Sequence, residues 1–223
     1  MFAPSSQGGP FRQGEILSDV VQVRLLVESL TADQDAELEF EEETHPFVVV
    51  LTQDCDLDWD FTSRASETDE NKRQNKLVPN ILLGELFPES VIRPRIGRNL
   101  DRVKSKQEFR YHYIPAVPLE CDLAGEGIEP LIVDFKRVLT VPCEEIYHRL
   151  NFGIRRRTLI QGLHMQDLSN RFAHYASRVG LPEEGTRPTL VIPGSAPVGA
   201  KGEPGFLQRL ARGLSFKSLK PPE

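Results

Sequence analysis

The residues best suited to chemistry form a polar cluster that directly follows an apolar stretch. Residues 46–52 are Pro-Phe-Val-Val-Val-Leu-Thr, and residues 53–60 are Gln-Asp-Cys-Asp-Leu-Asp-Trp-Asp. Apolar and β-branched residues favour a buried strand, so residues 46–52 are predicted to form one, with the cluster at its exposed end. Ends of strands on a rigid scaffold often carry binding and catalytic residues.

Cys55 is a candidate nucleophile within this cluster. A cysteine attacks as its thiolate, which nearby cations or a helix N-terminus favour. Its neighbours Asp54 and Asp56 carry the opposite charge, and the base partners His45 and His112 would have to be brought near by the fold. A small side chain packed at the end of a strand is the plainer interpretation, and a Cys55-dependent hydrolase is an alternative.

Four carboxylates alternate through the cluster, at Asp54, Asp56, Asp58 and Asp60. Carboxylate oxygens are suitable ligands for Ca²⁺ or Mg²⁺. An EF-hand loop starting at Asp54 would need Gly at its sixth position and Glu at its twelfth, where the chain has Trp59 and Ala65. We therefore predict no metal and no other cofactor, and keep Gln53, Asp54 and Asp56 as binding candidates.

A second candidate group combines cations with aromatic rings. Residues 110–113 are Arg-Tyr-His-Tyr, and six arginines and lysines lie between positions 93 and 106. Such mixtures are typical of proteins that bind RNA or single strands. If this stretch lies opposite residues 46–52, then Arg110, His112 and Thr52 could cleave a phosphodiester by general acid–base catalysis. The plainer alternative is a solvated face that pairs with the acidic part of the chain.

Helical spacing of apolar residues predicts one long helix over residues 156–179, with Gly180 and Pro182 ending it. Arg155, Arg156 and Arg157 would then lie at its start, where the helix dipole disfavours cations. These arginines are therefore binding candidates for a partner, with a plain surface cluster as the alternative.

The remaining elements are mostly strands. Strands are predicted over 20–27, 46–52, 109–117 and 131–139, with a short helix starting at 142. We expect a mainly β, α+β fold, in which a small SH3-like barrel carries the long C-terminal helix. The expected regions are a flexible arm over 1–13, a folded domain over 14–182, and a linker with a basic amphipathic tail over 183–223.

Composition favours a globular cytoplasmic protein. Hydrophobic residues make up 39% of the 223 positions, and no apolar run approaches the roughly 20 residues that span a membrane. Three widely spaced cysteines fit a reducing compartment, and no secretion signal is visible at the start. Residues 1–70 hold 17 acidic residues and three arginines, whereas residues 71–223 hold 16 acidic and 24 basic residues. The acidic part predicts a protein partner with a basic surface.

Three stretches resemble a set of uncharacterised bacterial proteins. Residues 13–16 are Gln-Gly-Glu-Ile, residues 52–56 are Thr-Gln-Asp-Cys-Asp, and an ending from Arg-Phe-Ala at 171–173 to Gly-Leu-Pro at 180–182 completes the match. The resemblance covers roughly residues 12–182, and it implies membership of a group without implying an activity.

The order of elements also resembles the MazF/PemK toxins, which are SH3-like barrels that cut RNA. Gly-Glu-Ile at 14–16, the Pro-led strand ending in Thr52, Val-Asp-Phe-Lys-Arg at 133–137 and Pro-Cys-Glu-Glu at 142–145 follow that order. His45 stands where the family has an arginine. The resemblance implies a ribonuclease, and in this alternative Thr52 would act together with the candidates Arg110 and His112, with His45 in place of the arginine.

The leading expectation is a cytoplasmic bacterial interaction or regulatory module from a toxin–antitoxin or phage-defence setting, which follows from resemblance. The alternatives are a MazF/PemK-like endoribonuclease, for which RNA would be the partner, and the Cys55 hydrolase. No membrane is expected as a partner.

Overall fold

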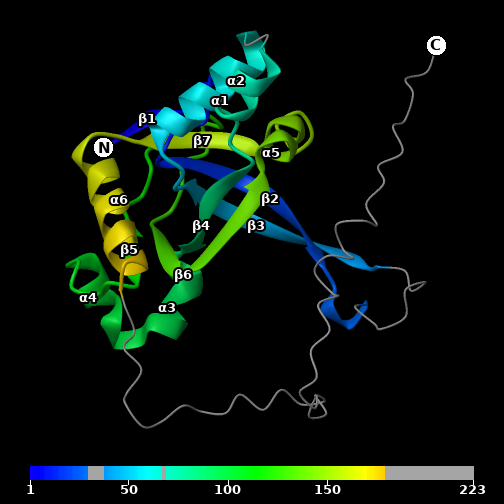
Figure 1. Ribbon diagram of the computed structural model, residues 1–223. Helices are drawn as coiled ribbons and strands as arrows, with labels where there is room; N and C mark the ends of the chain where they lie inside the picture. Colours follow the sequence, from blue (N-terminus) through cyan, green and yellow to red (C-terminus); the bar gives the residue numbers. More distant parts are fainter. Residues whose placement is uncertain (30–37, 67–68, 179–223) are drawn as a thin grey trace. The chain divides into compact units, whose positions relative to one another are not determined.

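Antiparallel strands dominate the fold, and the longer ones are rich in β-branched and other apolar residues. The computed structural model describes residues 1–29, 38–66 and 69–178, which lie in a compact unit assigned to Met1–Val179. One sheet with the order β1-β7-β2-β3-β4-β6-β5 forms its centre (Figure 1). The strands are β1 (Phe2–Pro4), β2 (Glu15–Leu25), β3 (Phe40–Val50), β4 (Asn80–Pro88), β5 (Tyr111–Ile114), β6 (Leu131–Pro142) and β7 (Arg155–Ile160).

Helices pack around this sheet. They are α1 (Asp54–Ser66), α2 (Glu70–Gln74), α3 (Glu89–Ile96), α4 (Leu100–Lys104), α5 (Cys143–Arg149) and α6 (Leu163–Ala176), with short 3₁₀ turns at Val27–Ser29, Gly97–Asn99 and Leu119–Cys121. The short helix predicted to begin at 142 is confirmed as α5. Within the described residues, none of these helices is both long and apolar enough to cross a membrane.

The α+β class is confirmed, but the sheet is not closed into a barrel. Its two ends are short edge strands: within the described residues, β1 pairs only with β7, and β5 pairs only with β6. The expected SH3-like closure would need further pairing between these edges. All six strand pairings along the sheet are antiparallel.

The helix predicted over residues 156–179 begins later in the structure than the sequence indicates. Residues 155–160 form β7, which lies between β1 and β2 in the sheet, and α6 begins only at Leu163 after Gly162. Pairing on both sides satisfies the backbone of β7, which outweighs the helical spacing of its apolar residues.

The segment 1–13 is tied to the domain and does not form the expected flexible arm. Phe2–Pro4 form β1 along β7, and the Phe11 side chain is fully buried. The expected linker and basic tail, 183–223, lie outside the described residues, so that prediction stays untested.

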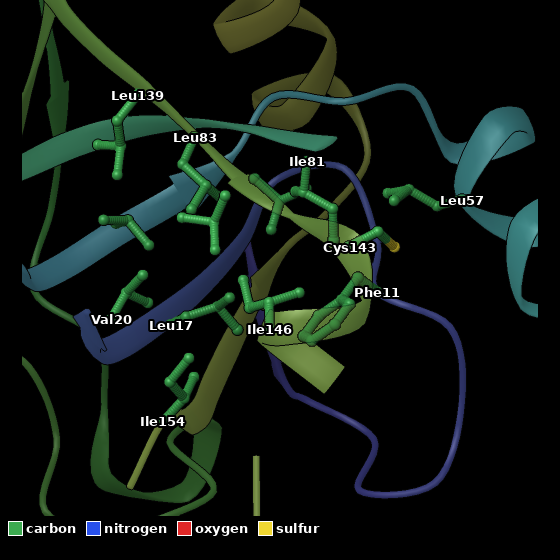
Figure 2. Close-up of a cluster of buried hydrophobic side chains, with 13 residues drawn as sticks. Phe11, Leu17, Val20, Leu57, Ile81, Leu83, Leu139, Cys143, Ile146 and Ile154 are labelled. Atoms are coloured by element: carbon green, nitrogen blue, oxygen red, sulfur yellow. The ribbon is translucent and has the colours of Figure 1, made fainter. Parts of the chain in front are cut away.

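The apolar core lies on both faces of the sheet because consecutive strand residues point to opposite sides. Val48 and Val50 belong to a cluster that also contains Leu57 of α1 and Ile146 of α5. Figure 2 shows members of this cluster, among them Phe11 and Leu17. Val49, whose side chain points to the opposite face, belongs to a second cluster, which α6 covers through Leu168 and Phe172. A third cluster lies under α3 and α4.

Gly14, directly before β2, has a backbone conformation and close neighbours that favour glycine. Its φ is +82°, and an added Cβ would lie 3.0 Å from Met165 Cγ and 3.3 Å from the Ile160 carbonyl oxygen. We expect Gly14→Ala to lower the free energy of unfolding by about 1–3 kcal/mol, measured by urea denaturation. Gly8→Ala is the control, because nothing lies within 4 Å of its added Cβ. Equal effects in the two variants would contradict this expectation.

Candidate functional site

The strand predicted over 46–52 ends where β3 gives way to α1. Val48–Val50 are buried, and the Leu51 backbone N donates to the Leu82 carbonyl oxygen at 2.9 Å. Thr52 Oγ1 then accepts a hydrogen bond from the Leu82 backbone N at 2.8 Å. The Thr52 side chain therefore continues the pairing with β4 after the β3 backbone has turned away, and its expected catalytic role stays a prediction.

The acidic cluster enters α1 as its first turns. Asp54 Oδ1 accepts a hydrogen bond from the Gln13 backbone N at 2.7 Å and lies 3.2 Å from Arg12 Nε. Carboxylates are favoured at a helix start, and residues two apart on a helix do not share a face. Within the described ranges, no group of three or more His, Cys, Asp or Glu side chains is arranged to hold a metal ion.

Asp60 fixes the segment after α2 against α1, and sequence reasoning gave it no such role. Its fully buried carboxylate accepts from the Val78 backbone N and from Arg64 Nε, both at 2.8 Å, and from Cys143 Sγ at 3.3 Å. Burial, with the adjacent carboxylate, raises the pKa of the Cys143 thiol to about 12. No local sequence signal separates Asp60 from the exposed aspartates before it.

A groove with a volume of about 760 Å³ lies between α1 and α6. Its lining combines polar and apolar residues from four parts of the chain: Gln13, Leu51, Thr52, Gln53, Asp56, Trp59, Asn75, Lys76, Leu77, Val78, Pro79, Asn80, Leu82, Ser169, Asn170, Phe172 and Ala173. Gln13, residues 52–56 and residues 171–173 are the stretches that carry the first resemblance, and each contributes to this lining. The binding candidates Gln53 and Asp56 are thus brought together here.

Cys55 is exposed in the first turn of α1 and does not line this groove. Its Sγ lies 3.7 Å from Gln53 Oε1 and 3.6 Å from Asp56 Oδ1. The expected base partners lie elsewhere, because His45 is on β3 and His112 is on β5, and both are buried. The fold therefore does not assemble the expected Cys–His pair.

His45 belongs to a buried polar group inside the sheet. Its Nδ1 lies 3.3 Å from Glu85 Oε1, and Glu85 also accepts a hydrogen bond from Arg137. Burial opposes the negative charge of Glu85, but the hydrogen bonds from His45 and Arg137 outweigh this and lower the pKa of the carboxyl. His45 is therefore engaged internally and does not take the place of the toxin family's arginine at an open site.

The predicted catalytic set is not assembled. Thr52 follows β3, whereas Arg110 and His112 belong to the β5 region, and β4 and β6 lie between β3 and β5 in the sheet. Arg110 donates twice to the buried Asp134 carboxylate, from Nε at 2.8 Å and from Nη2 at 2.6 Å. His112 is buried, and loss of hydration lowers its pKa to about 4. A neutral, buried imidazole is a poor general acid at neutral pH.

The three consecutive arginines each pair within the chain. Arg155 donates to Asp19 at 2.9 and 3.1 Å. The two arginines after it are buried: Arg156 forms a double hydrogen bond with Glu15 at 2.6 and 2.9 Å, and Arg157 with Asp122 at 2.8 and 2.7 Å. Arg156 and Arg157 are therefore held inside the protein on β7, whereas Arg155 is exposed, and its role as a binding residue stays a prediction.

The acidic part of the chain is predicted to bind a partner with a basic surface. It contributes to a second candidate surface, which we call the outer hairpin. It consists of residues 21–25 of β2 and 40–44 of β3, which pair with each other. β7 pairs with β2 only over 15–18, and β4 pairs with β3 only over 47–50. Figure 1 shows this part of the hairpin projecting away from the helices.

Comparison of the chain with family models, with curated proteins and with solved structures gave no match.

Proposed function

We propose that the protein is an interaction module that binds a basic, partly apolar protein surface through its outer hairpin. One observation carries the proposal: within the described residues, the outer hairpin has no strand partner on either edge. Unpaired strand edges expose backbone donors and acceptors that a partner can satisfy.

The side chains of the outer hairpin combine apolar groups with carboxylates. Leu25 lies opposite Phe40, and Val23 lies opposite Glu42, so these four residues share one face. Leu25, Phe40 and Val23 are exposed, with 62% of Phe40 accessible. A contiguous apolar face with an acidic surround is typical of a protein-binding surface.

The charges favour a basic partner over a nucleic acid. Arg24 Nη1 pairs with Glu43 at 2.6 Å, and Arg149 Nη2 pairs with Glu42 at 3.2 Å. Glu41 of the outer hairpin and Glu39 directly before it form no ion pair within the described residues, so this surface keeps a net negative charge. Phosphate backbones are bound by cations, and an acidic surface repels them.

The ribonuclease alternative has less support, because Thr52 lies apart from Arg110 and His112. The toxin–antitoxin or phage-defence setting remains part of the proposal on resemblance alone. A partner encoded beside the protein would be the first candidate in such a setting.

The test begins with a photo-crosslinking residue at Val23 in the full chain, which is exposed to lysate of the source organism. The captured partner is then purified, and its affinity is measured by isothermal titration calorimetry. We expect Glu39→Lys/Glu41→Lys to weaken binding at least tenfold, because it reverses two negative charges beside the edge of β3 that β4 leaves unpaired. Added salt should weaken the wild-type complex as well.

The matched control is Asp101→Lys/Glu120→Lys, which makes the same change in net charge at two exposed positions of other elements. Its affinity should stay within twofold of wild type. Equal weakening by both double variants would show that only net charge matters, and it would refute the outer hairpin as the binding surface.

A further inference from the structure

We infer that the groove between α1 and α6 is a separate binding site for a short, extended peptide segment of neutral or basic character. The inference goes beyond the proposed function, because the groove lining includes no residue of the outer hairpin.

Unused hydrogen-bonding groups are the first observation. Asn75, Asn80 and Asn170 line the groove, and within the described part of the chain their side chains form no hydrogen bond. Each asparagine amide presents both a donor and an acceptor. An extended peptide presents N–H and C=O groups along its backbone, so the three amides complement it without requiring a charged ligand.

An aromatic side chain beside these amides is the second observation. Trp59 lines the groove one turn of α1 after Asp56, and the residue is 59% exposed. Leu77, Leu82 and Phe172 add apolar surface to the lining. An indole ring buries a large apolar area when a ligand side chain packs on it, which favours a peptide with one apolar residue.

The charges of the groove lining favour a peptide over a nucleic acid as the ligand. Asp56 and Lys76 are the charged residues of the groove lining, so the lining has no excess of positive charge, and the nearby Asp54 and Asp58 pair with Arg12. A lining without a cluster of cations is poorly suited to phosphate groups, and it can accept a neutral or basic peptide. The groove volume of about 760 Å³ lies within the roughly 300–1,000 Å³ of pockets that hold small ligands, so only a short segment fits.

The walls of the groove are held in place by the protein itself. Gln13 Nε2 donates to the Leu51 carbonyl oxygen at 3.2 Å, and Asp60 holds the backbone N of Val78 at 2.8 Å. On the α6 side, Phe172 packs on Phe135 with ring centroids 5.7 Å apart. A site formed before binding loses less entropy when the ligand arrives.

The test uses random heptapeptides displayed on phage, which are selected against the full chain and then synthesised. Trp59 is the only tryptophan of the chain, so its fluorescence reports directly on the groove. We expect selected peptides to shift this fluorescence with saturation. The Asn80→Ala/Asn170→Ala double variant should weaken their binding at least tenfold, since two hydrogen bonds are lost.

Two controls make the outcome decisive. Asn99→Ala removes an exposed amide outside the groove and should leave peptide affinity within twofold. Glu39→Lys/Glu41→Lys should also leave it unchanged, so failure of the outer hairpin and failure of the groove are distinguishable. Oligouridylate serves as the nucleic-acid probe. Saturable binding of oligouridylate in place of peptides, or peptide binding that Asn80→Ala/Asn170→Ala leaves intact, would overturn the inference.

Discussion

Arg156→Met is expected to lower the free energy of unfolding by about 3–5 kcal/mol, since it removes one partner of a buried ion pair. Glu15 is 1% exposed and accepts two hydrogen bonds from the Arg156 guanidinium, at 2.6 and 2.9 Å. Without Arg156, the Glu15 carboxylate would remain buried with only the Arg12 backbone N as its donor, at 3.0 Å.

Arg156 also fixes the chain before β2. Its guanidinium donates to the carbonyl oxygens of Gly9 and Pro10 at 2.8 and 2.9 Å, and it lies 5.0 Å from the centroid of the Phe11 ring. Methionine keeps much of the apolar volume and loses all these hydrogen bonds. The loss should therefore spread to the segment 1–13, which would become accessible to limited proteolysis.

Urea denaturation followed by circular dichroism measures the effect. Arg155→Met is the matched control on the same strand, because Arg155 is 53% exposed and its pair with Asp19 is at the surface. Surface pairs contribute about 0–1 kcal/mol, so this control should stay close to wild type. A loss in Arg156→Met no larger than that of Arg155→Met would show that the buried pair has no special weight.

Local patterns in the sequence predict the strands well where one face is buried. The apolar run at 46–52 and the stretch at 131–139 lie largely within β3 and β6, because their valines and isoleucines fill the core. The start of the last helix was not predictable in this way. Whether residues 155–160 form a helix or a strand depends on β1 and β2, which lie far away in the sequence.

The candidate site is predictable only in part for the same reason. Gln53 and Asp56 stand out as polar residues after a strand, and they do line the groove. Asn80 and Asn170 carry no local signal, because their shared groove exists only once α6 packs beside β4. For Arg156 the sequence misleads in the opposite way. A run of arginines predicts a binding surface, but in the fold the Arg156 side chain pairs with a carboxylate from a distant segment.

Stability should fall by about 2 kcal/mol between pH 7 and pH 5 because of His112 alone. Burial lowers the pKa of this imidazole from 6.5 to about 4; Asp167 partly opposes the shift, while the nearby cations Arg171 and Lys106 add to it. Its Nδ1 is buried without a hydrogen-bond partner in the described structure, so protonation would place an uncompensated charge there.

The direction follows from which state binds the proton. Above about pH 6.5 neither state is protonated at His112, and the full stability is present. As the pH falls from 6.5 towards 4, the unfolded chain binds a proton at His112 and the folded protein does not, so the free energy of unfolding decreases. Below about pH 4 both states carry the proton, and the contribution of His112 stops changing.

His112→Leu should remove this pH dependence, because leucine keeps an apolar contact with Phe135 and does not titrate. Free energies of unfolding from urea titrations at pH 7, 6 and 5 measure it. That window lies above the pKa values of most carboxyls, so their titration adds little there.

His148→Gln is the control, because His148 is exposed, and it should keep the wild-type slope. An unchanged slope in His112→Leu would mean that the buried imidazole is protonated within the folded protein, and it would return His112 to the list of groups able to exchange a proton at neutral pH.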